Sequence, residues 1–362
     1  MPLTTSASTA SVWLEREPHN PFPMATPTVA IVLVNYNGAA FLDEFASSLA
    51  RVSYPEQRLF IIDNASTDGS RERLLELFGP AETAPGWSTE SPPGLGAGRP
   101  AHPQDWGQGG RACLLFNDTN VGLAPALNQA LQRCLDGRTN YVLLLNTDTT
   151  HAPDFLDKLV AVADDRTIVV PKILSYFDHG RINTHAGGFD WTRGTFRGTY
   201  DGRPDGPWTA ARREIETASF CCMLIPAPVF HDIGGMDERL AMYYEDTDFA
   251  ARARAMGYRL LFEPTSVIYH REGGSGGGKE SPFKHYYATR NRPYLVKKHS
   301  GRLRYAVFTA YFLATRAARM ALYALRRNRP LLRAQWLALR DYYGGRMGMT
   351  YTPAELSKAV GM

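Results

Sequence analysis

Residues 141–150, YVLLLNTDTT, begin with a run of five apolar residues that stops abruptly at Asn-Thr-Asp. A short continuous apolar run is typical of a strand that is buried on both faces, as in a parallel sheet. Two earlier stretches end in the same way, LFIIDNASTDGS at 59–70 and VAIVLVNYNG at 29–38. Because parallel strands end at a common edge, these endings predict that polar groups at neighbouring strand tips are used together.

Apolar runs and helical patterns alternate along the first half of the chain. The expected strands lie at 29–34, 59–62, 112–116, 141–145 and 168–174. The expected helices, placed by apolar residues at helical spacing or by start and stop signals, lie at 41–52, 70–78, 123–135 and 153–165. This order predicts an α/β fold with a Rossmann-like, mostly parallel sheet and flanking helices.

The remaining segments predict an insertion and, after the parallel strands, a change of pattern. Residues 79–110 are crowded with Gly and Pro and show no periodicity, which predicts a long insertion loop. Alternating Gly, Thr and aromatic residues at 187–202 predict hairpins or an irregular β segment, and 218–226 predict a buried strand. Residues 228–264 predict a short helix, a loop, a longer helix and a strand.

Size and charge exclude some classes of protein. The 362 residues suffice for one large or two ordinary domains, and the net charge of +4 is too small for bulk nucleic-acid binding. The basic excess lies near the C-terminus, between Lys297 and Arg340. The cysteines show no metal-ligand spacing, so we expect small buried side chains in a reducing compartment; they are Cys113, Cys134, Cys221 and Cys222.

The two ends of the chain predict different behaviour. Residues 1–27 are polar and Pro-rich without a basic start and an apolar block, which predicts a flexible lead-in rather than a signal peptide, and hence a cytoplasmic protein. The most apolar stretch, 304–327, contains Arg316 and Arg319 and is not expected to span a membrane. Residues 301–345 predict basic amphipathic helices that either lie on an anionic membrane surface or pack on the rest of the chain or a partner subunit.

Asp63 and Asp148 each follow directly on an apolar run. In a parallel α/β sheet this is the edge at which ligands bind, so we expect the two carboxylates to face one crevice. Asp63 could accept hydrogen bonds from the base or sugar of a ligand, and Asp148 could hold a hard cation such as Mg²⁺ or Mn²⁺. The alternative for each is a turn former or a helix cap, but their common edge favours a site.

A third acidic group lies in MYYEDTDFAARARAMGYR, residues 242–259, which reads as a loop that enters a helix. Glu245, Asp246 and Asp248 fall at or before the first turn, where the helix dipole favours ionised carboxylates. A well-placed carboxylate can take the proton of an attacking alcohol. The alternative is an acidic cap. His270 ends the apolar pattern that follows, as either a metal ligand or a hydrogen-bonded structural residue.

These stretches, together with NVGLAPALNQA at 120–130, stand in the order seen in family 2 glycosyltransferases of the GT-A fold. They are most similar to bacterial rhamnosyltransferase-like members that build surface polysaccharides. The resemblance covers residues 28–295 and implies a GT-A catalytic domain there. Residues 296–362 then form a basic helical C-terminal region.

The resemblance also implies roles for individual residues. The donor site would consist of Asn35, Tyr36, Asn37, Asp63, Asn64, Asp68, Asn120, Gly122, Asn146, Thr147 and Arg290. The family carries an Asp-x-Asp metal motif at residues 146–148, but here Asn146 replaces the first acid, so Asp148 would be its sole metal ligand. His270 stands where related enzymes often have a metal-binding histidine. Asp246 resembles the general base, with Glu245 beside it.

The resemblance therefore implies an inverting glycosyltransferase that uses a divalent cation, Mg²⁺ or Mn²⁺. It would move a sugar, with rhamnose suggested, from a nucleotide diphosphate sugar to a hydroxyl of a saccharide or lipid-linked saccharide in surface polysaccharide synthesis. A homo-oligomer and peripheral contact with the inner face of the cell membrane stay open. The alternatives are a sugar-phosphate nucleotidyltransferase, disfavoured because residues 35–45 contain one glycine and no Lys or Arg, and a non-catalytic nucleotide-sugar binding protein.

Overall fold

The computed structural model describes residues 26–78, 112–183, 186–198, 201–271 and 281–362. The predicted insertion loop at 79–110 lies outside these ranges. All but the last two residues of the predicted lead-in at 1–27 also lie outside them.

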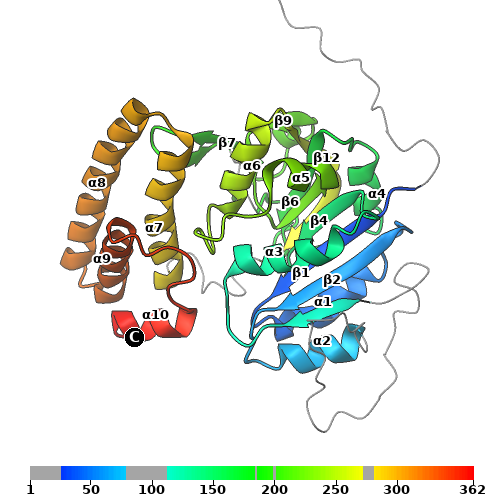
Figure 1. Cartoon of the computed structure of the whole chain (residues 1–362), viewed down its shortest axis with the longest axis horizontal. Helices are drawn as coiled ribbons and strands as arrows, with labels where there is room; N and C mark the ends of the chain where they lie inside the picture. Colours follow the sequence, from blue (N-terminus) through cyan, green and yellow to red (C-terminus); the bar gives the residue numbers. More distant parts are fainter. Residues whose placement is uncertain (1–25, 79–111, 184–185, 199–200, 272–280) are drawn as a thin grey trace, which may run out of the picture.

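A mixed sheet forms the centre of the larger part of the molecule (Figure 1). Its strands are β1 (Val29–Asn35), β2 (Gln57–Asp63), β3 (Cys113–Phe116), β4 (Tyr141–Leu145), β5 (Thr149–His151), β6 (Thr167–Ser175), β9 (Arg213–Ile215), β11 (Cys222–Pro226) and β12 (Arg259–His270). They run in the order β3-β2-β1-β4-β11-β6-β12-β5, and β9 pairs with β12.

The sheet is mixed, and the part built from β3, β2, β1 and β4 is parallel, as predicted. The pairs β1–β2, β2–β3, β1–β4 and β6–β12 are parallel, and the register brings Asn35 opposite Asp63 and Asp63 opposite Phe116. The buried strand predicted at 218–226 is present as β11, but its position was not predicted: it lies between β4 and β6 and is antiparallel to both. Its apolar sequence indicates a buried strand, and such a run carries no signal for its direction.

Helices cover both faces of the sheet. They are α1 (Ala39–Leu49), α2 (Ser70–Phe78), α3 (Leu123–Cys134), α4 (Phe155–Val160), α5 (Ala227–Ile233) and α6 (Glu245–Ala255). In β1, Ile31 and Leu33 pack with α1, α2 and α4, whereas Ala30 and Val32 pack with α3, α5 and α6. This double burial explains the continuous apolar runs, since each fully buried aliphatic side chain contributes about 2 kcal/mol.

A small second sheet follows the central strands. It contains β7 (Ala186–Asp190), β8 (Thr195–Arg197) and β10 (Thr217–Ala218), and a 3₁₀ turn, η1 (Pro207–Thr209), lies between β8 and β10. The antiparallel pair β7–β8 is the hairpin that the alternating pattern at 187–202 predicted.

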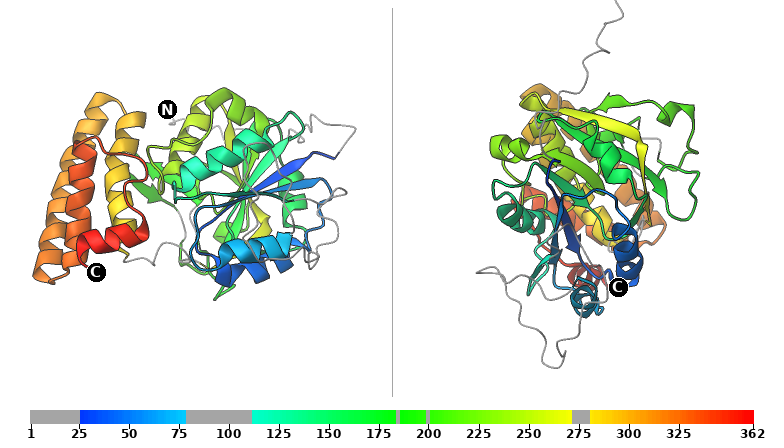
Figure 2. Two further views of the ribbon diagram at one scale, coloured as in Figure 1. Left: turned by 60° about the horizontal axis from the view of Figure 1, so that its bottom comes forward. Right: turned by 90° about the vertical axis from the view of Figure 1, so that its right-hand side faces the viewer.

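The C-terminal helices form a separate layer beside the sheet (Figures 1 and 2). They are α7 (Pro282–His299), α8 (Arg302–Leu325), α9 (Arg329–Tyr343) and α10 (Pro353–Val360). Tyr286 and Tyr287 of α7 pack with α9, α10 and Ala241, which belongs to the loop before α6. The predicted boundary at 295 therefore lies within α7. Among the described helices, none combines the length and apolar composition that crossing a membrane requires.

Candidate active site

The strand tips meet at one pocket of about 110 Å³. Asn37 follows β1, Asn64 follows β2, Asn120 precedes α3, and Asp148 lies beyond the end of β4. The predicted donor-site and metal-site residues that line it are Tyr36, Asn37, Asn64, Asn120, Asn146, Thr147 and Asp148. Distant segments of the chain thus supply one polar cavity at the carboxyl edge of the sheet, where α/β proteins bind ligands.

Asn64 organises the side of the pocket between β2 and α3. Its Oδ1 accepts hydrogen bonds from the Asn117 side chain and from the Val121 N–H, both at 3.1 Å. Its Nδ2 donates to Asn120 Oδ1 at 3.0 Å and to the Gly122 carbonyl at 3.2 Å. Because both ends of the amide are used within the protein, Asn64 fixes the loop that carries Asn120.

Gly122 allows the loop before α6 to approach α3. Its φ is +93°, and a Cβ at this position would lie 3.1 Å from the Ala241 side chain. The Ala241 carbonyl accepts a hydrogen bond from the Ala124 N–H at 3.0 Å. Gly122 does not line the pocket itself; it brings Met242, the residue after Ala241, to the pocket wall.

Asn35, Asp63 and Asp68 lie next to the pocket but not among its lining residues. Asp63 is buried and accepts the Ser66 N–H at 3.1 Å. Burial raises the pKa of Asp63, although its hydrogen bonds with Ser66 and Asn35 act in the opposite direction. Asp68 accepts the N–H groups of Ala39 and Ser70, so its carboxylate stabilises the starts of α1 and α2.

Asp148 and His270 are in direct contact. His270 Nε2 lies 3.2 Å from Asp148 Oδ1, and His270 Nδ1 lies 2.6 Å from Asn183 Oδ1. A hydrogen bond from Nδ1–H to Asn183 leaves Nε2 directed at the carboxylate. Burial by itself lowers the pKa of His270, but Cys221 and the Asp148 carboxylate outweigh it and raise that pKa well above its usual value.

The Asp148–His270 pair fits two ligands of a divalent cation. A carboxylate oxygen and an oriented imidazole nitrogen converge, and Asn183 holds the imidazole from behind, as outer-shell partners of metal-binding histidines do. No cluster of three potential side-chain ligands occurs in the described part of the chain. A cation here would therefore take its other ligands from water and phosphate, as Mg²⁺ and Mn²⁺ commonly do.

The loop before α6 has a strained backbone. Ala241, Tyr243 and Tyr244 have φ values of +57°, +66° and +74°. Residues with a Cβ rarely occupy this left-handed region, and each such residue costs on the order of 1 kcal/mol or more. A backbone of this kind needs surrounding contacts that hold it in place.

Asn291 and Arg290 of α7 supply these contacts. The side-chain amide of Asn291 donates to the carbonyls of Leu240, Met242 and Tyr243 at 2.7, 2.8 and 3.0 Å. The guanidinium of Arg290 is 0% exposed and donates to the Gly348 carbonyl, Thr350 Oγ1 and the Leu240 carbonyl. Arg290 was predicted to bind the donor; in the structure its hydrogen bonds go to two loops of the protein.

The loop delivers Glu245 and Asp246 to the first turn of α6, and both are buried. Asp246 Oδ1 accepts hydrogen bonds from the Thr247 N–H at 2.6 Å and from Thr247 Oγ1 at 3.1 Å. Glu245 Oε2 has no hydrogen-bond partner among the described residues. Burial, followed by the charge of Asp246, raises the pKa of Glu245 well above its usual value. Glu245 is therefore the member of the pair that holds a proton.

Asp248, two residues further on, has a structural role. Its carboxylate bonds to Arg252 at 2.8 Å and to Lys298 and His299 at 2.7 Å, which ties α6 to the end of α7. Burial alone would raise the pKa of Asp248, but the hydrogen bond with His299 and the charges of Arg252 and Lys298 lower it to about 2.

The motifs did not identify some residues at the site. Phe41, Leu123 and Met242 line the pocket as apolar side chains of helices or loops, and such residues carry no pattern that separates them from the core. Asn183 contacts His270 although it lies outside every quoted motif. The Asn183 N–H donates to the Ile173 carbonyl of β6 at 3.0 Å, and β6 pairs with β12, which ends at His270.

Known proteins are related to this chain in sequence or in fold. The model of Glycosyl transferase family 2 matches residues 98–229. Over 76% of its length the chain is 27% identical to an uncharacterised protein of Sinorhizobium fredii, and covers 28% of that relative. It is 25% identical, over 76% of its length, to the N-acetylglucosaminyl-diphospho-decaprenol L-rhamnosyltransferase of Mycobacterium tuberculosis, of which it covers 86%. The crystal structure of GalNAc-T7 with UDP, GalNAc and Mn²⁺ superposes on 74% of this chain and 51% of that one, with a TM-score of 0.50 and 17% identity.

Proposed function

We propose that this chain, which resembles family 2 glycosyltransferases in sequence and has the GT-A fold, transfers a sugar, rhamnose, from a nucleotide diphosphate sugar to a hydroxyl of a saccharide or lipid-linked saccharide. This reaction would serve the synthesis of a surface polysaccharide. The observation that carries the proposal is the polar pocket at the strand tips with the Asp148–His270 pair at its edge. The name of the mycobacterial relative supports both rhamnose and a lipid-linked acceptor.

The donor would lie in the strand-tip pocket. Tyr36, Asn37 and Asn120 offer polar groups to its nucleotide and sugar. Asp148 and His270 would hold the cation, and imidazole suits Mn²⁺ better than Mg²⁺. A bound cation would neutralise charge that builds on the diphosphate as it leaves. The Mn²⁺ named with the structural neighbour is consistent with this choice.

Asp246 would act as the general base. The acceptor oxygen forms a bond to the anomeric carbon, the bond between that carbon and the diphosphate oxygen breaks, and the acceptor proton passes to the Asp246 carboxylate. This single displacement inverts the anomeric configuration and needs no covalent intermediate. The raised pKa of Glu245 supports these roles, because burial favours its protonated form, which is a poorer base than a carboxylate.

Nucleotide-sugar binding tests the function directly. We expect one donor in a panel of dTDP-rhamnose, UDP-sugars and GDP-mannose to raise the midpoint of thermal unfolding, and to do so only with Mn²⁺. A donor at 100 times its Kd should add about 2.7 kcal/mol to the free energy of unfolding. Asp148→Asn should remove the Mn²⁺-dependent part of the shift.

The matched control is Asp154→Asn, which neutralises an acid in an exposed ion pair with Lys158 and should bind like the wild type. An unchanged shift in Asp148→Asn would contradict its role as a metal ligand. Release of pyrophosphate from a nucleoside triphosphate and a sugar phosphate would contradict glycosyl transfer itself.

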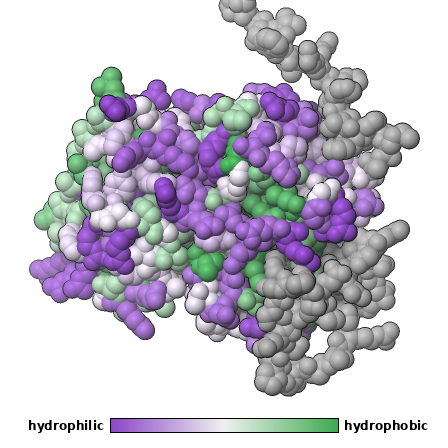
Figure 3. Space-filling view, in the orientation of Figure 1, coloured by the Kyte–Doolittle hydropathy of each residue, from purple (hydrophilic) through white to green (hydrophobic). Residues whose placement is uncertain are grey.

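We also propose that α8 lies against an anionic lipid surface. Several of its exposed side chains are apolar, with Leu303 and Leu325 79% and 82% exposed, and the end of the molecule that carries α8 shows apolar and polar residues side by side (Figure 3). Arg302, Arg304 and Arg326 flank these leucines, and residues 302–325 contain no acidic residue. Apolar side chains with basic flanks suit the boundary between headgroups and acyl chains, where a lipid-linked acceptor would be met.

Vesicle co-sedimentation tests this contact. We expect binding to vesicles that contain phosphatidylglycerol and little binding to pure phosphatidylcholine vesicles. Leu303→Glu with Leu325→Glu should weaken binding at least about tenfold, since each substitution adds a charge that the lipid repels. Phe177→Glu is the control, because Phe177 is 76% exposed on the sheet domain. A dimer that the double substitution dissociates, with no vesicle binding, would show that a second copy covers α8 instead.

A further inference from the structure

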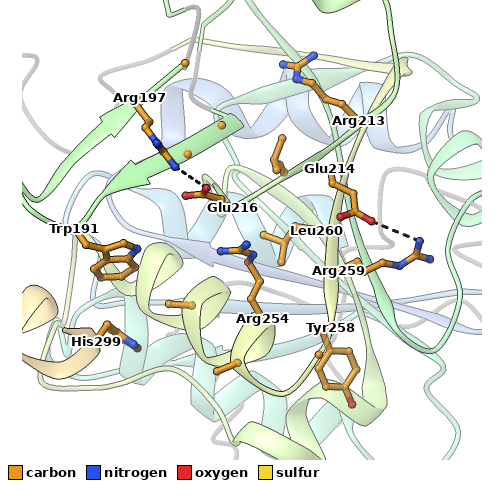
Figure 4. Close-up of a pocket in the computed structure, with 17 residues that line it drawn as sticks. Trp191, Arg197, Arg213, Glu214, Glu216, Arg254, Tyr258, Arg259, Leu260 and His299 are labelled. Atoms are coloured by element: carbon orange, nitrogen blue, oxygen red, sulfur yellow. Dashed lines mark hydrogen bonds and ion pairs between the residues drawn. The ribbon is translucent and has the colours of Figure 1, made fainter. Parts of the chain in front are cut away.

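A second and larger hollow of about 910 Å³ lies along α6 and shares no lining residue with the strand-tip pocket. Its walls come from α6, from β9 and the start of β12, and from the hairpin β7–β8 (Figure 4). The volume falls within the range of sites that bind small molecules. We refer to it as the α6 groove. None of the roles argued above uses it.

The α6 groove carries a net positive charge, because four arginines and two glutamates line it. Arg197 pairs with Glu216 at 2.8 Å, and Arg259 lies 3.7 Å from Glu214. Glu216 also accepts the Phe189 N–H at 3.0 Å. Arg254, by contrast, makes no close ion pair or hydrogen bond with any residue in the described ranges, although its charge helps to lower the pKa of Glu216; its side chain rises from α6 between these walls (Figure 4). A guanidinium left open in this way suits a carboxylate, which it can bind through two parallel hydrogen bonds.

The groove also offers the surfaces that a sugar ring needs. Trp191 lines the groove. Its ring centroid lies 4.7 Å from that of Phe189, in an edge-on contact, and 5.3 Å from that of His299, and these contacts hold the ring. The ring is half-buried, so its position is fixed while part of it faces the groove. Gly187 and Gly188 line the same wall without side chains, and their backbone pairs with β10 and β8. An amphipathic ring beside charged hydrogen-bonding groups can take both the C–H face and the hydroxyls of a saccharide.

One end of the α6 groove lies near the first turn of α6, the turn that carries the acid pair. His299 Nε2 bonds to Asp248 Oδ1 at 2.7 Å in the first turn of α6, and Tyr244, directly before Glu245, stacks on Phe196 of the hairpin. The groove then follows α6 to Arg254, eight residues beyond Asp246, which corresponds to about 12 Å along the helix. An oligosaccharide, unlike a single sugar, can span this distance.

We propose that the α6 groove binds the acceptor chain beyond its reacting sugar, and that this chain is an acidic oligosaccharide whose carboxylate pairs with Arg254. The inference rests on the proposed function for the identity of the ligand. The groove would discriminate between acceptors by contacting acceptor sugars that take no part in the reaction. The strand-tip pocket cannot make this discrimination.

Calorimetric titration with tetragalacturonate, in the absence of donor, tests the groove by itself. We expect the tetramer to bind, with neutral maltotetraose and monomeric galacturonate binding at least about tenfold more weakly. Arg254→Gln should weaken tetramer binding by about tenfold or more, since it removes a charge-assisted contact. Arg193→Gln is the matched control. Arg193 lies in the turn of the β7–β8 hairpin, is exposed and does not line the groove.

Equal affinity for tetragalacturonate and maltotetraose, or an unchanged affinity in Arg254→Gln, would overturn the proposal, as would absence of binding at millimolar tetramer. Arg254 is exposed, so its replacement should leave the fold intact. Failure here is distinct from failure of the glycosyltransferase assignment, because the donor-dependent thermal shift is measured without any acceptor and should be the same in Arg254→Gln and the wild type.

Discussion

Asp246→Asn is expected to lower turnover about 100-fold or more, while donor binding stays close to that of the wild type. The amide keeps the shape of the side chain and the hydrogen bond that it accepts from the Thr247 N–H, but it cannot accept the acceptor's proton. A general base typically contributes a factor of about 10² to 10⁴, which sets the size of the loss. Initial rates with saturating donor and acceptor measure turnover. The Mn²⁺-dependent rise in the unfolding temperature on adding the donor measures donor binding.

Glu245→Gln is the sharpest comparison, because it makes the same chemical change one residue away. Burial raises the pKa of Glu245, so a glutamine resembles the protonated form that the side chain already adopts. We expect a smaller loss, on the order of tenfold, through altered packing around Asp246. The reverse order, with Glu245→Gln the more damaged variant, would move the role of base from Asp246 to Glu245. Equal and full turnover in both variants would remove the pair from the mechanism.

Asn291→Ala is expected to destabilise the protein by about 3 kcal/mol or more and to lower turnover as well. It leaves the buried carbonyls of Leu240, Met242 and Tyr243 without their donor, and each unsatisfied group costs about 1 to 3 kcal/mol. The loss is of the same order as the strain in the three left-handed residues nearby. Without the donor, we expect the loop to relax and to carry Met242 and the acid pair out of position.

Denaturant unfolding measures the stability, and the ratio of kcat to KM measures the site. Asn328→Ala is the control, since Asn328 caps α9 through one hydrogen bond to the Leu331 N–H and should cost only about 1 kcal/mol. If Asn291→Ala cost no more than Asn328→Ala, the loop before α6 would not depend on α7. A destabilised variant with unchanged kcat/KM would show that the loop keeps its shape without Asn291.

The sequence predicted the layered part of the fold well because one physical cause dominates there. The strands β1, β2 and β4 are buried on both faces, so burial appears as uninterrupted apolar runs whose polar ends mark the carboxyl edge. The pocket formed by Asn37, Asn64, Asn120 and Asp148 follows from that geometry. An apolar run does not indicate which strand lies beside it or in which direction it runs. The antiparallel position of β11 between β4 and β6 was therefore not predicted.

The division between side chains that face a ligand and those that support the site was also beyond the sequence. The resemblance implies that Arg290 binds the donor, and in the structure its hydrogen bonds go to Gly348, Thr350, Leu240 and Asn291. Asp68 shares a segment with pocket residues and binds the starts of two helices. The proton on Glu245 depends on burial beside Asp246, and burial is set by the packing of helices that are distant in sequence.

The hydrogen bonds from α7 to the loop before α6 restrict how such enzymes can diversify. Exchanging the C-terminal helices between relatives would seem a simple route to a new membrane or acceptor preference, because none of them supplies a lining residue of the strand-tip pocket. Here that exchange would leave the pocket complete but remove the amide that shapes the loop carrying the acids. Helices can therefore be inherited from another enzyme only together with a residue that replaces Asn291.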